Sequence, residues 1–315
     1  MPAERDEYST TISGLCDRAE ALRRAGRLDD AVAQFATLDL PDGATEADHL
    51  RVSLAQGRLF TDRVFYANRG YTEAVAALEA AGARAKQLDD ALSFATALDL
   101  LGLAEYNRTM QAGALDYGAA LGQFQEALAQ REELHDSRGV AESLFHVGLV
   151  HERLEQYDDA LDKYQRAYTL ARDNGHQLEL SYAARHLAGG AQAMGNLDAA
   201  VALFRESLTL RQALDYTLLL PLSHVALGGA LLTQQDTDGA AREYEQAQTL
   251  AEGMQSPLAV VFSLLALSEL AHSRGHEDAR RNYAEQALSH AQEDNVALGV
   301  RMVQAALAAR AQERA

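Results

Sequence analysis

Residues 146–167 read HVGLVHERLEQYDDALDKYQRA, and this stretch aligns with HLAGGAQAMGNLDAAVALFRES (186–207) and VALGGALLTQQDTDGAAREYEQA (225–247). Each stretch has a small residue, an alanine twelve positions later and an aromatic residue four positions after that alanine. The three sets are Gly148, Ala160 and Tyr164; Ala188, Ala200 and Phe204; and Gly228, Ala240 and Tyr244. The alanines at 160, 200 and 240 are evenly spaced, so the chain contains an internal repeat with a period of 40.

The same register continues on both sides of these stretches. One period upstream stand Ala120, Phe124 and Ala127. Downstream, Ala279 and Tyr283 are the expected equivalents, after a turn that is one residue shorter. Two weaker copies of the pattern lie nearer the N-terminus: Ala31 with Phe35, and Ala74 with Leu78. The sequence therefore predicts seven repeat units.

The spacing within a unit is typical of two helices joined by a short turn. The small residue and the alanine are expected where the two helices cross, because only small side chains allow a close approach there. The aromatic residue fills the gap toward the next unit, and turns such as Gly195–Asn196 interrupt the apolar period. No single helix pair can bury its apolar face, so stacked units must supply one continuous core.

The pattern of small residue, alanine, aromatic and alanine resembles the tetratricopeptide repeat. The resemblance implies an all-α, right-handed superhelical solenoid whose first helices line a concave groove. Two features depart from the family: the usual early Trp is replaced by Leu144, Ala184 and His224, and the period of 40 exceeds the usual length of about 34. Long-period arrays of this kind resemble the Pins/LGN scaffolds, kinesin light chains and bacterial Rap-type regulators, which bind peptides or proteins in the groove.

We expect a single solenoid domain over residues 1–315. Its repeats are expected at roughly 5–40, 45–85, 86–137, 138–176, 177–216, 217–255 and 256–293. Residues 295–314 carry Val296, Val300, Val303 and Leu307 without a partner helix, so they predict a capping helix over the last repeat.

Two segments lengthen the second and third units. They are Phe60–Gly70 and Met110–Gly118, which fall between the small residue (Gly57, Gly102) and the next alanine (Ala74, Ala120) and widen that interval beyond twelve positions. One interpretation is a longer helix pair with a longer turn. The other is a loop that folds over the groove and belongs to a ligand site.

The composition excludes several classes of protein. The net charge of −18 argues against nucleic-acid binding, because a phosphate backbone would be repelled. No apolar run is long enough to span a bilayer, and the N-terminus lacks a signal-peptide pattern, so a cytoplasmic location without membrane contact is the expectation. Cys16 is the only cysteine, which rules out an intrachain disulfide and a cysteine-based zinc site.

The residues expected to contact a ligand are those of the first helices that point inward. In this family they lie three positions before the small residue and one, four or five positions after it, which places them on one helical stripe. With neighbours at the edge of the stripe, the candidates are Arg58, Asp62, Asp99, Tyr106, Asn107, Phe145, His146, Leu149, Glu152, Arg153, Tyr182, Arg185 and Gln192.

Three arginines on the expected inner face of an acidic protein indicate a site for an acidic or C-terminal peptide. Arg58, Arg153 and Arg185 could each form two parallel hydrogen bonds with a carboxylate or phosphate. The alternative is that they pair with Glu152, Asp99 and Asp62 inside the protein and bind nothing else.

No residue pattern predicts catalysis, a metal site or a cofactor. His146 and His186 occupy similar positions in adjacent units and could stack, and no set of Asp, Glu or Cys completes a metal site around them or around His272 and His276. Ser13–Cys16 is not a nucleophile elbow.

The leading hypothesis is a non-enzymatic scaffold or adaptor that binds a protein or peptide along the groove. A sensor that closes around a small ligand or signalling peptide is the second hypothesis. An enzyme or biosynthetic accessory protein with a pocket in the solenoid is the third, since a fold does not fix a function. Self-association through the terminal repeats also remains open.

Overall fold

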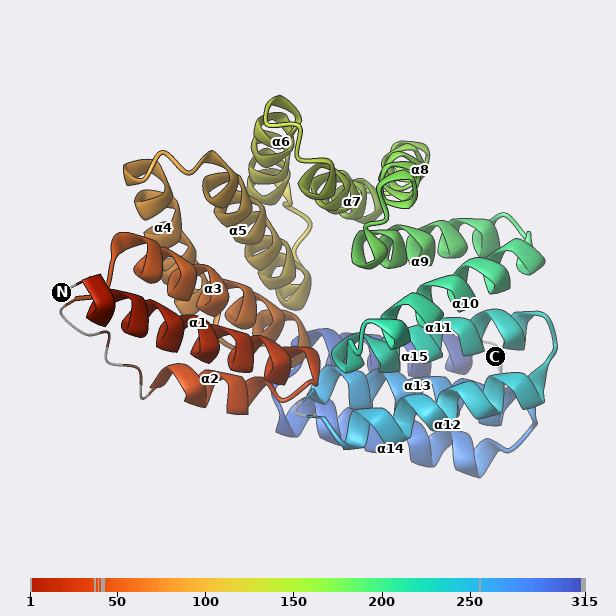
Figure 1. Ribbon diagram of the computed structural model, residues 1–315. Coiled ribbons are helices and arrows are strands. Elements are labelled where there is room, and N and C mark those ends of the chain that lie inside the picture. Colours follow the sequence, from red (N-terminus) through yellow and green to blue (C-terminus); the bar gives the residue numbers. More distant parts are fainter. Residues whose placement is uncertain (1, 37, 39, 41–42, 255, 313–315) are drawn as a thin grey trace.

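The computed structural model describes residues 2–36, 38, 40, 43–254 and 256–312, with side chains between Ser9 and Ala309. Within these ranges the chain forms fifteen α-helices, one short 3-10 helix and no strand, which confirms the all-α prediction (Figure 1). The elements are α1 (Pro2–Arg24), α2 (Leu28–Ala36), α3 (Glu46–Ala67), α4 (Tyr71–Gln87), α5 (Ala91–Ala112), α6 (Gly118–Glu133), α7 (Ser137–Arg153), α8 (Tyr157–Asn174), α9 (Gln177–Ala193), α10 (Leu197–Ala213), η1 (Thr217–Leu219), α11 (Leu220–Thr233), α12 (Thr237–Glu252), α13 (Pro257–Ser273), α14 (Glu277–Glu293) and α15 (Ala297–Gln312).

The helices pack in consecutive pairs, α1 with α2 through α13 with α14, and α15 covers the last pair. The predicted solenoid of seven helix pairs with a C-terminal capping helix is therefore confirmed. From Ser137 onward the helical segments start at equal intervals, at positions 137, 157, 177, 197, 217, 237, 257, 277 and 297. The repeat period thus consists of two equal halves, one for each helix of the pair.

A backbone turn in the left-handed region precedes eight of these nine helical segments, and residue 255, before α13, lies outside the described residues. Positive φ angles occur at His135, Glu155, Gly175, Gly195, Asp215, Gln235, Gly275 and Asn295. The residue after each one donates its amide hydrogen to a carbonyl five positions back; the distance is 2.9 Å from Gln156 to His151 and 2.8 Å from His176 to Ala171. These bonds close the helix ends in the manner of a Schellman motif, so the turn geometry sets the helix length.

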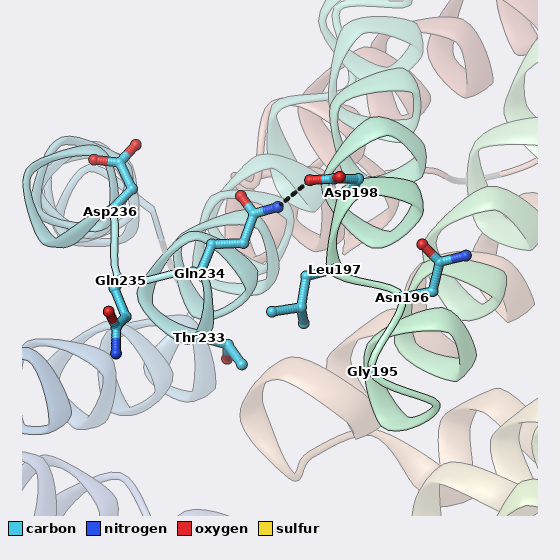
Figure 2. A pocket seen from close by; sticks show the side chains of 8 residues that line it. All are labelled: Gly195, Asn196, Leu197, Asp198, Thr233, Gln234, Gln235 and Asp236. Atoms are coloured by element: carbon cyan, nitrogen blue, oxygen red, sulfur yellow. Dashed lines mark hydrogen bonds between the residues drawn. The ribbon is translucent and has the colours of Figure 1, made fainter.

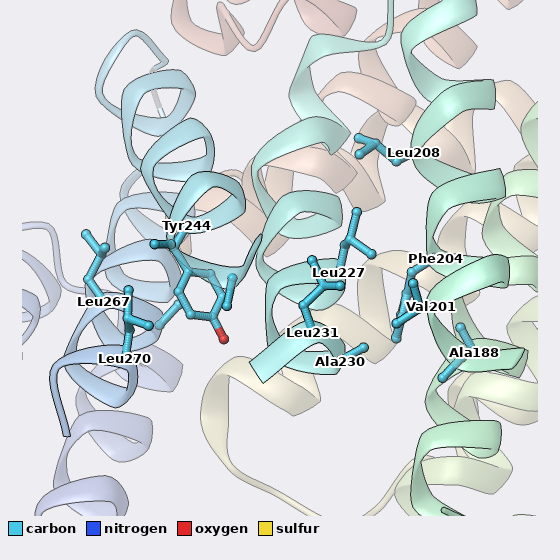
Figure 3. Close-up of a cluster of buried hydrophobic side chains, with 14 of the residues drawn as sticks. Ala188, Val201, Phe204, Leu208, Leu227, Ala230, Leu231, Tyr244, Leu267 and Leu270 are labelled. Carbon is cyan, nitrogen blue, oxygen red and sulfur yellow. The ribbon is translucent and has the colours of Figure 1, made fainter. Parts of the chain in front are cut away.

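The predicted close crossing of the two helices is also confirmed. A Cβ atom placed on Gly148 would lie 2.6 Å from the ring of Tyr164, and one on Gly102 would lie 2.7 Å from the ring of Phe124. At these two positions a larger residue would displace the aromatic ring, because the ring rests on the helix backbone. Figure 3 shows the same packing continuing through the later units, where Leu227 and Leu231 lie between Phe204 and Tyr244.

The predicted register of the seventh unit is wrong. The buried positions of α14 are Arg280, Ala284, Ala287 and Ala291, whereas Ala279 and Tyr283 are only partly buried. The turn before α14 has the same length as in the other units, so the period stays at 40. The position of the aromatic residue is held by Ala284, and the tyrosine beside it misled the alignment.

The first lengthened segment is mainly helical, and the second is the end of a long helix followed by a five-residue turn. α3 and α5 have 22 residues each, and they continue to Ala67 and Ala112 before short turns at Asn68–Gly70 and Gly113–Tyr117. The interpretation of a longer helix pair is therefore correct, and the interpretation of a loop folded over the groove is not.

The extra helical turns close the array on itself. α3 contacts α13, α5 contacts α15, and α1 contacts η1, so the first units meet the last ones (Figure 1). Asn68 donates to the carbonyl of Asn295 (2.9 Å), and Arg301 donates to the carbonyls of Met110 (2.6 Å) and Gln111 (2.8 Å). Contacts between units so far apart in sequence curl the solenoid so that the first helices face one another.

Candidate binding surface on the first helices

The candidate residues all lie on α3, α5, α7 and α9, but many of them are enclosed between helices. Asp99, Tyr106, Asn107, Phe145 and His146 are all buried. This burial removes the five residues from the exposed part of the inner face. The partly exposed candidates are Arg58, Asp62, Leu149, Glu152, Arg153, Tyr182, Arg185 and Gln192.

Asp99 is the centre of a buried charge network. Its carboxylate, which is 0 % exposed, accepts hydrogen bonds from Ser143 Oγ (2.7 Å) and His146 Nδ1 (2.7 Å) and lies 3.3 Å from the guanidinium of Arg131. Burial would raise the pKa of Asp99, but His146 and Arg131 lower it below its ordinary value. Asp99 and His146 therefore act in the packing of α5 against α7.

Arg131 completes this network from the end of α6. It is 2 % exposed, and its guanidinium donates to Ser143 Oγ (2.7 Å), to the carbonyl of Gly139 (3.0 Å) and to Glu142 (3.0 Å). Two carboxylates neutralise the buried cation, and its two terminal nitrogens have acceptors while Nε has none among the described residues. Pairing with carboxylates makes a buried charge tolerable.

Tyr106 and Asn107 fix α5 to its neighbours. Asn107 Nδ2 donates to the carbonyl of Thr61 (3.2 Å), which links α5 to α3. Arg153 Nε donates to the hydroxyl of Tyr106 (3.1 Å), and a second nitrogen of Arg153 lies 3.4 Å from Met110 Sδ. Arg153 is exposed on its outer side, so its guanidinium is the part of this group that a ligand could reach.

Glu152, like Asp99, bonds to a histidine of the following unit. It accepts hydrogen bonds from His186 Nδ1 (2.9 Å) and from the hydroxyl of Tyr164 (2.7 Å). Phe145 lies between the units, with its ring 5.4 Å from His146, 5.1 Å from His186 and stacked on Tyr182 at 5.2 Å. The two histidines thus contact the same phenylalanine and do not stack directly on each other.

Replacing Glu152 with glutamine is expected to remove an acid-sensitive part of the stability. Burial would raise the pKa of Glu152, but the hydrogen bonds from His186 and Tyr164 lower it to about 2. A carboxyl group with a lowered pKa in the folded state stabilises the protein above its ordinary pKa, and this contribution is lost as the pH falls toward about 2. The difference in unfolding free energy between wild type and Glu152→Gln, measured by urea titration, should shrink over that range. A difference that is independent of pH would contradict the assignment.

Asp62 is held by a residue that the repeat pattern did not identify. Arg23, at the end of α1, forms an ion pair with Asp62 and donates to Glu20 from Nε (2.7 Å). The guanidinium of Arg23 also lies 5.3 Å from the ring centre of Tyr216, which precedes η1. Contacts between α1 and η1 depend on the closure of the array, so no signal within the repeat could have revealed them.

Arg211 is a second residue that the prediction missed. It lies at the end of α10, is 3 % exposed, and donates to Ser223 Oγ (2.7 Å) and Ser181 Oγ (3.3 Å). Its guanidinium stands 5.3 Å from the ring centre of Tyr182. The signal for it was present in the sequence, because the equivalent position of the neighbouring units holds the buried alanines Ala171 and Ala251.

The three inner-face arginines do not form the ion pairs that were expected as the alternative to ligand binding. Arg58 lies 3.9 Å from Glu142, and Arg185 contacts His186 Nε2 (3.3 Å). Asp62 and Asp99 pair with Arg23 and Arg131 instead. Gln192 bonds to Thr233 Oγ1 (3.1 Å), and Leu149 packs into the core between α5 and α8.

Two hollows occur farther along the array. One lies at the turns between α9 and α10 and between α11 and α12, where Gln234 donates to Asp198 (2.8 Å) (Figure 2). The other is lined by α11, α12 and α13 and includes Gly229, Tyr244 and Glu269. Neither hollow brings together side chains that indicate a catalytic site or a site for a charged ligand.

The described part of the chain contains no group of three His, Cys, Asp or Glu residues that could hold a metal ion. Within the same residues, no helix combines the length and the apolar character needed to cross a membrane.

Comparison with known proteins identifies the type of repeat. Residues 110–173, from the end of α5 into α8, match the family model of the tetratricopeptide repeat. No curated protein matches the sequence.

Solved structures share the fold over most of the chain. A Rap protein complexed with competence and sporulation factor aligns with a TM-score of 0.64 and 14 % identity, over 94 % of this chain and 80 % of that one. A Rap conjugation gene regulator of plasmid pLS20 in complex with the Phr* peptide gives 0.60 and 13 %, over 89 % and 84 %. The apo form of RapI gives 0.59 and 13 %, over 95 % and 98 %. The chain thus contains a tetratricopeptide repeat segment within an all-α array that has the fold of the Rap proteins.

Proposed function

We propose that this chain binds a protein or peptide segment on the inner face formed by its first helices. The observation that carries the proposal is how few carboxylates lie near the inner-face arginines. Among the described residues, Arg153 and Arg185 form no ion pair with a carboxylate, and the carboxylate nearest to Arg58 is 3.9 Å away. The guanidinium groups of Arg153 and Arg185 therefore remain available to an anionic partner.

The fold supports this proposal. Closure of the array places the first helices opposite one another, so a segment between them would contact several units at once. Two of the similar solved structures are complexes, one with competence and sporulation factor and one with the Phr* peptide. The matching family model describes a repeat, and tetratricopeptide arrays are used for protein interactions. These points favour a binding scaffold over an enzyme.

The test is a charge reversal on the inner face. The double variant Arg153→Glu with Arg185→Glu should lose its partners in affinity capture from the native cell, because it replaces two cations by anions at the proposed site. The matched control is Arg205→Glu with Arg242→Glu, which makes the same change on the exposed sides of α10 and α12. Recovery of the same partners by wild type and the inner-face variant, with the helical content unchanged, would refute the proposal.

A further inference from the structure

Arg131 and Arg211 occupy the same position two repeats apart. Each lies at the end of the second helix of its unit, is buried, and donates to the hydroxyl of an equivalent serine at 2.7 Å: Ser143 for Arg131 and Ser223 for Arg211. The negative end of the helix dipole favours both cations equally. The two arginines therefore differ only in what else surrounds them.

The carboxylates that neutralise Arg131 are missing around Arg211. The position equivalent to Asp99, three residues before the small residue of the first helix, is held by Arg185. The position equivalent to Glu142 is held by Leu222. An acid is thus replaced by a base and another acid by an apolar residue, so the buried cation has a second cation as its neighbour.

The pKa values of Arg211 and Arg185 agree with the loss of these two acids. Burial lowers the pKa of Arg211 to about 10, and the positive charge of Arg185 contributes to the decrease. Burial also lowers the pKa of Arg185. Within the described residues neither guanidinium has a carboxylate in ion-pair contact, and Glu152, which acts on Arg185 from a distance, is already bonded to His186 and Tyr164. Arg211 and Arg185 therefore lie in each other's electrostatic field without a carboxylate in ion-pair contact, in a protein of net charge −18.

Three tyrosines from different parts of the chain lie near Arg211, whose guanidinium is 5.3 Å from the ring centre of Tyr182, while Tyr66 and Tyr216 share one buried cluster. Tyr66 comes from α3, Tyr182 from α9, and Tyr216 from the turn before η1. Electrostatic interactions connect Tyr66 with Arg185, Arg211 and Tyr216, so the group forms where the closed array brings the early and late units together. No hydrogen bond of the three hydroxyl groups to another described residue is present. The nearby carboxylate of Asp62 is occupied by Arg23.

We infer that Arg185 and Arg211, with the hydroxyl groups of Tyr66, Tyr182 and Tyr216, form a seat for one carboxylate of the bound segment. This inference rests on the proposed function and names the chemistry of the ligand. A guanidinium presents donors in a planar fork that matches a carboxylate, and tyrosine hydroxyls add further donors. The incoming carboxylate would take the place that Asp99 holds beside Arg131.

The test measures stabilisation by small blocked peptides. A ligand that binds only the folded state raises the unfolding midpoint in proportion to its affinity. The probes are acetylated pentaalanine with a free C-terminus, its C-terminal amide, the amide with a central aspartate, and inorganic phosphate, each compared with sodium chloride at equal ionic strength. The free C-terminus and the aspartate distinguish the two sources of a carboxylate, and at least one of them should raise the midpoint while the plain amide should not.

Variants assign the effect to the seat. Arg185→Gln and Arg211→Gln should each weaken the response about tenfold or more, since each removes a charge-assisted hydrogen bond. Arg205→Gln, on the exposed side of the same α10, should leave it unchanged. Arg185→Asp should abolish the response, because the introduced carboxylate would fill the seat as Asp99 does.

Three results would overturn the inference. One is a response to inorganic phosphate alone, which would assign a different ligand class. Another is a response that persists in both glutamine variants. The third is no response in a protein whose partner capture is still lost on charge reversal of the inner face; in that case the proposed function would stand and the carboxylate seat would fall.

Discussion

Replacing Arg131 with glutamine is expected to lower the free energy of unfolding by about 3–5 kcal/mol, the usual cost of breaking a buried ion pair. The substitution would leave Asp99 without its guanidinium partner, although the carboxylate is 0 % exposed and cannot regain water. Glutamine would also lose the contacts with Ser143 and the Gly139 carbonyl. Urea unfolding followed by circular dichroism measures the change.

Arg211→Gln is the matched control for this prediction. It removes a similarly buried guanidinium and an equivalent bond to a serine, but it leaves no carboxylate unpaired. The loss should therefore be smaller, about 1–3 kcal/mol for the hydrogen bonds to Ser223 and Ser181, and relief of the repulsion from Arg185 reduces it further. Equal losses for the two variants would show that the charge environments of Arg131 and Arg211 do not differ as described.

Replacing Gly148 with valine is expected to have the second large effect. A Cβ atom at this position would lie 2.6 Å from the ring of Tyr164, and a β-branched side chain adds two further carbons in the same space. Because the ring is enclosed between α7, α8 and α9, it cannot move away without opening the unit. We expect a loss of about 3 kcal/mol or more, at the upper end of the usual cost of overpacking.

The control for Gly148→Val is an alanine at Gly122. This glycine lies inside α6, is exposed, and has nothing within 4 Å of an added Cβ atom. Alanine there should stabilise the protein by about 0.5–1 kcal/mol, because it restricts the unfolded chain and favours the helix. A destabilising effect at Gly122, or a neutral effect at Gly148, would contradict the account of how the two helices pack.

The repeat could be predicted from the sequence because its signals are local. The small residue, the alanine and the aromatic residue recur at fixed spacing, and each one has a direct packing role. The register failed only in the seventh unit, where Arg280 and Ala284 stand at positions that hold alanine and an aromatic residue elsewhere. The positions of the turns would have corrected it, since helical segments start at equal intervals from Ser137 to Ala297.

The candidate surface was only partly predictable for a physical reason. Helical spacing identifies the side of the first helices that faces inward, but burial depends on what the next helix contributes. Asp99 was expected on an open face, and it is enclosed because Arg131 and His146 bind it. The approach of Arg23 to Tyr216 depends on the curvature of the whole array, which a repeat pattern does not contain. Arg211, in contrast, was visible as an arginine among buried alanines.

A carboxylate seat on the inner face requires that Arg185 and Arg211 lack a carboxylate in ion-pair contact and that a ligand carboxylate supplies it. Its most direct test is the unfolding midpoint of Arg185→Asp, measured with and without the blocked peptides. This variant is expected to be more stable than wild type, because the introduced carboxylate neutralises Arg211. Its midpoint should no longer respond to the peptides. A variant that is less stable than wild type, or that responds to the peptides as wild type does, would contradict the claim.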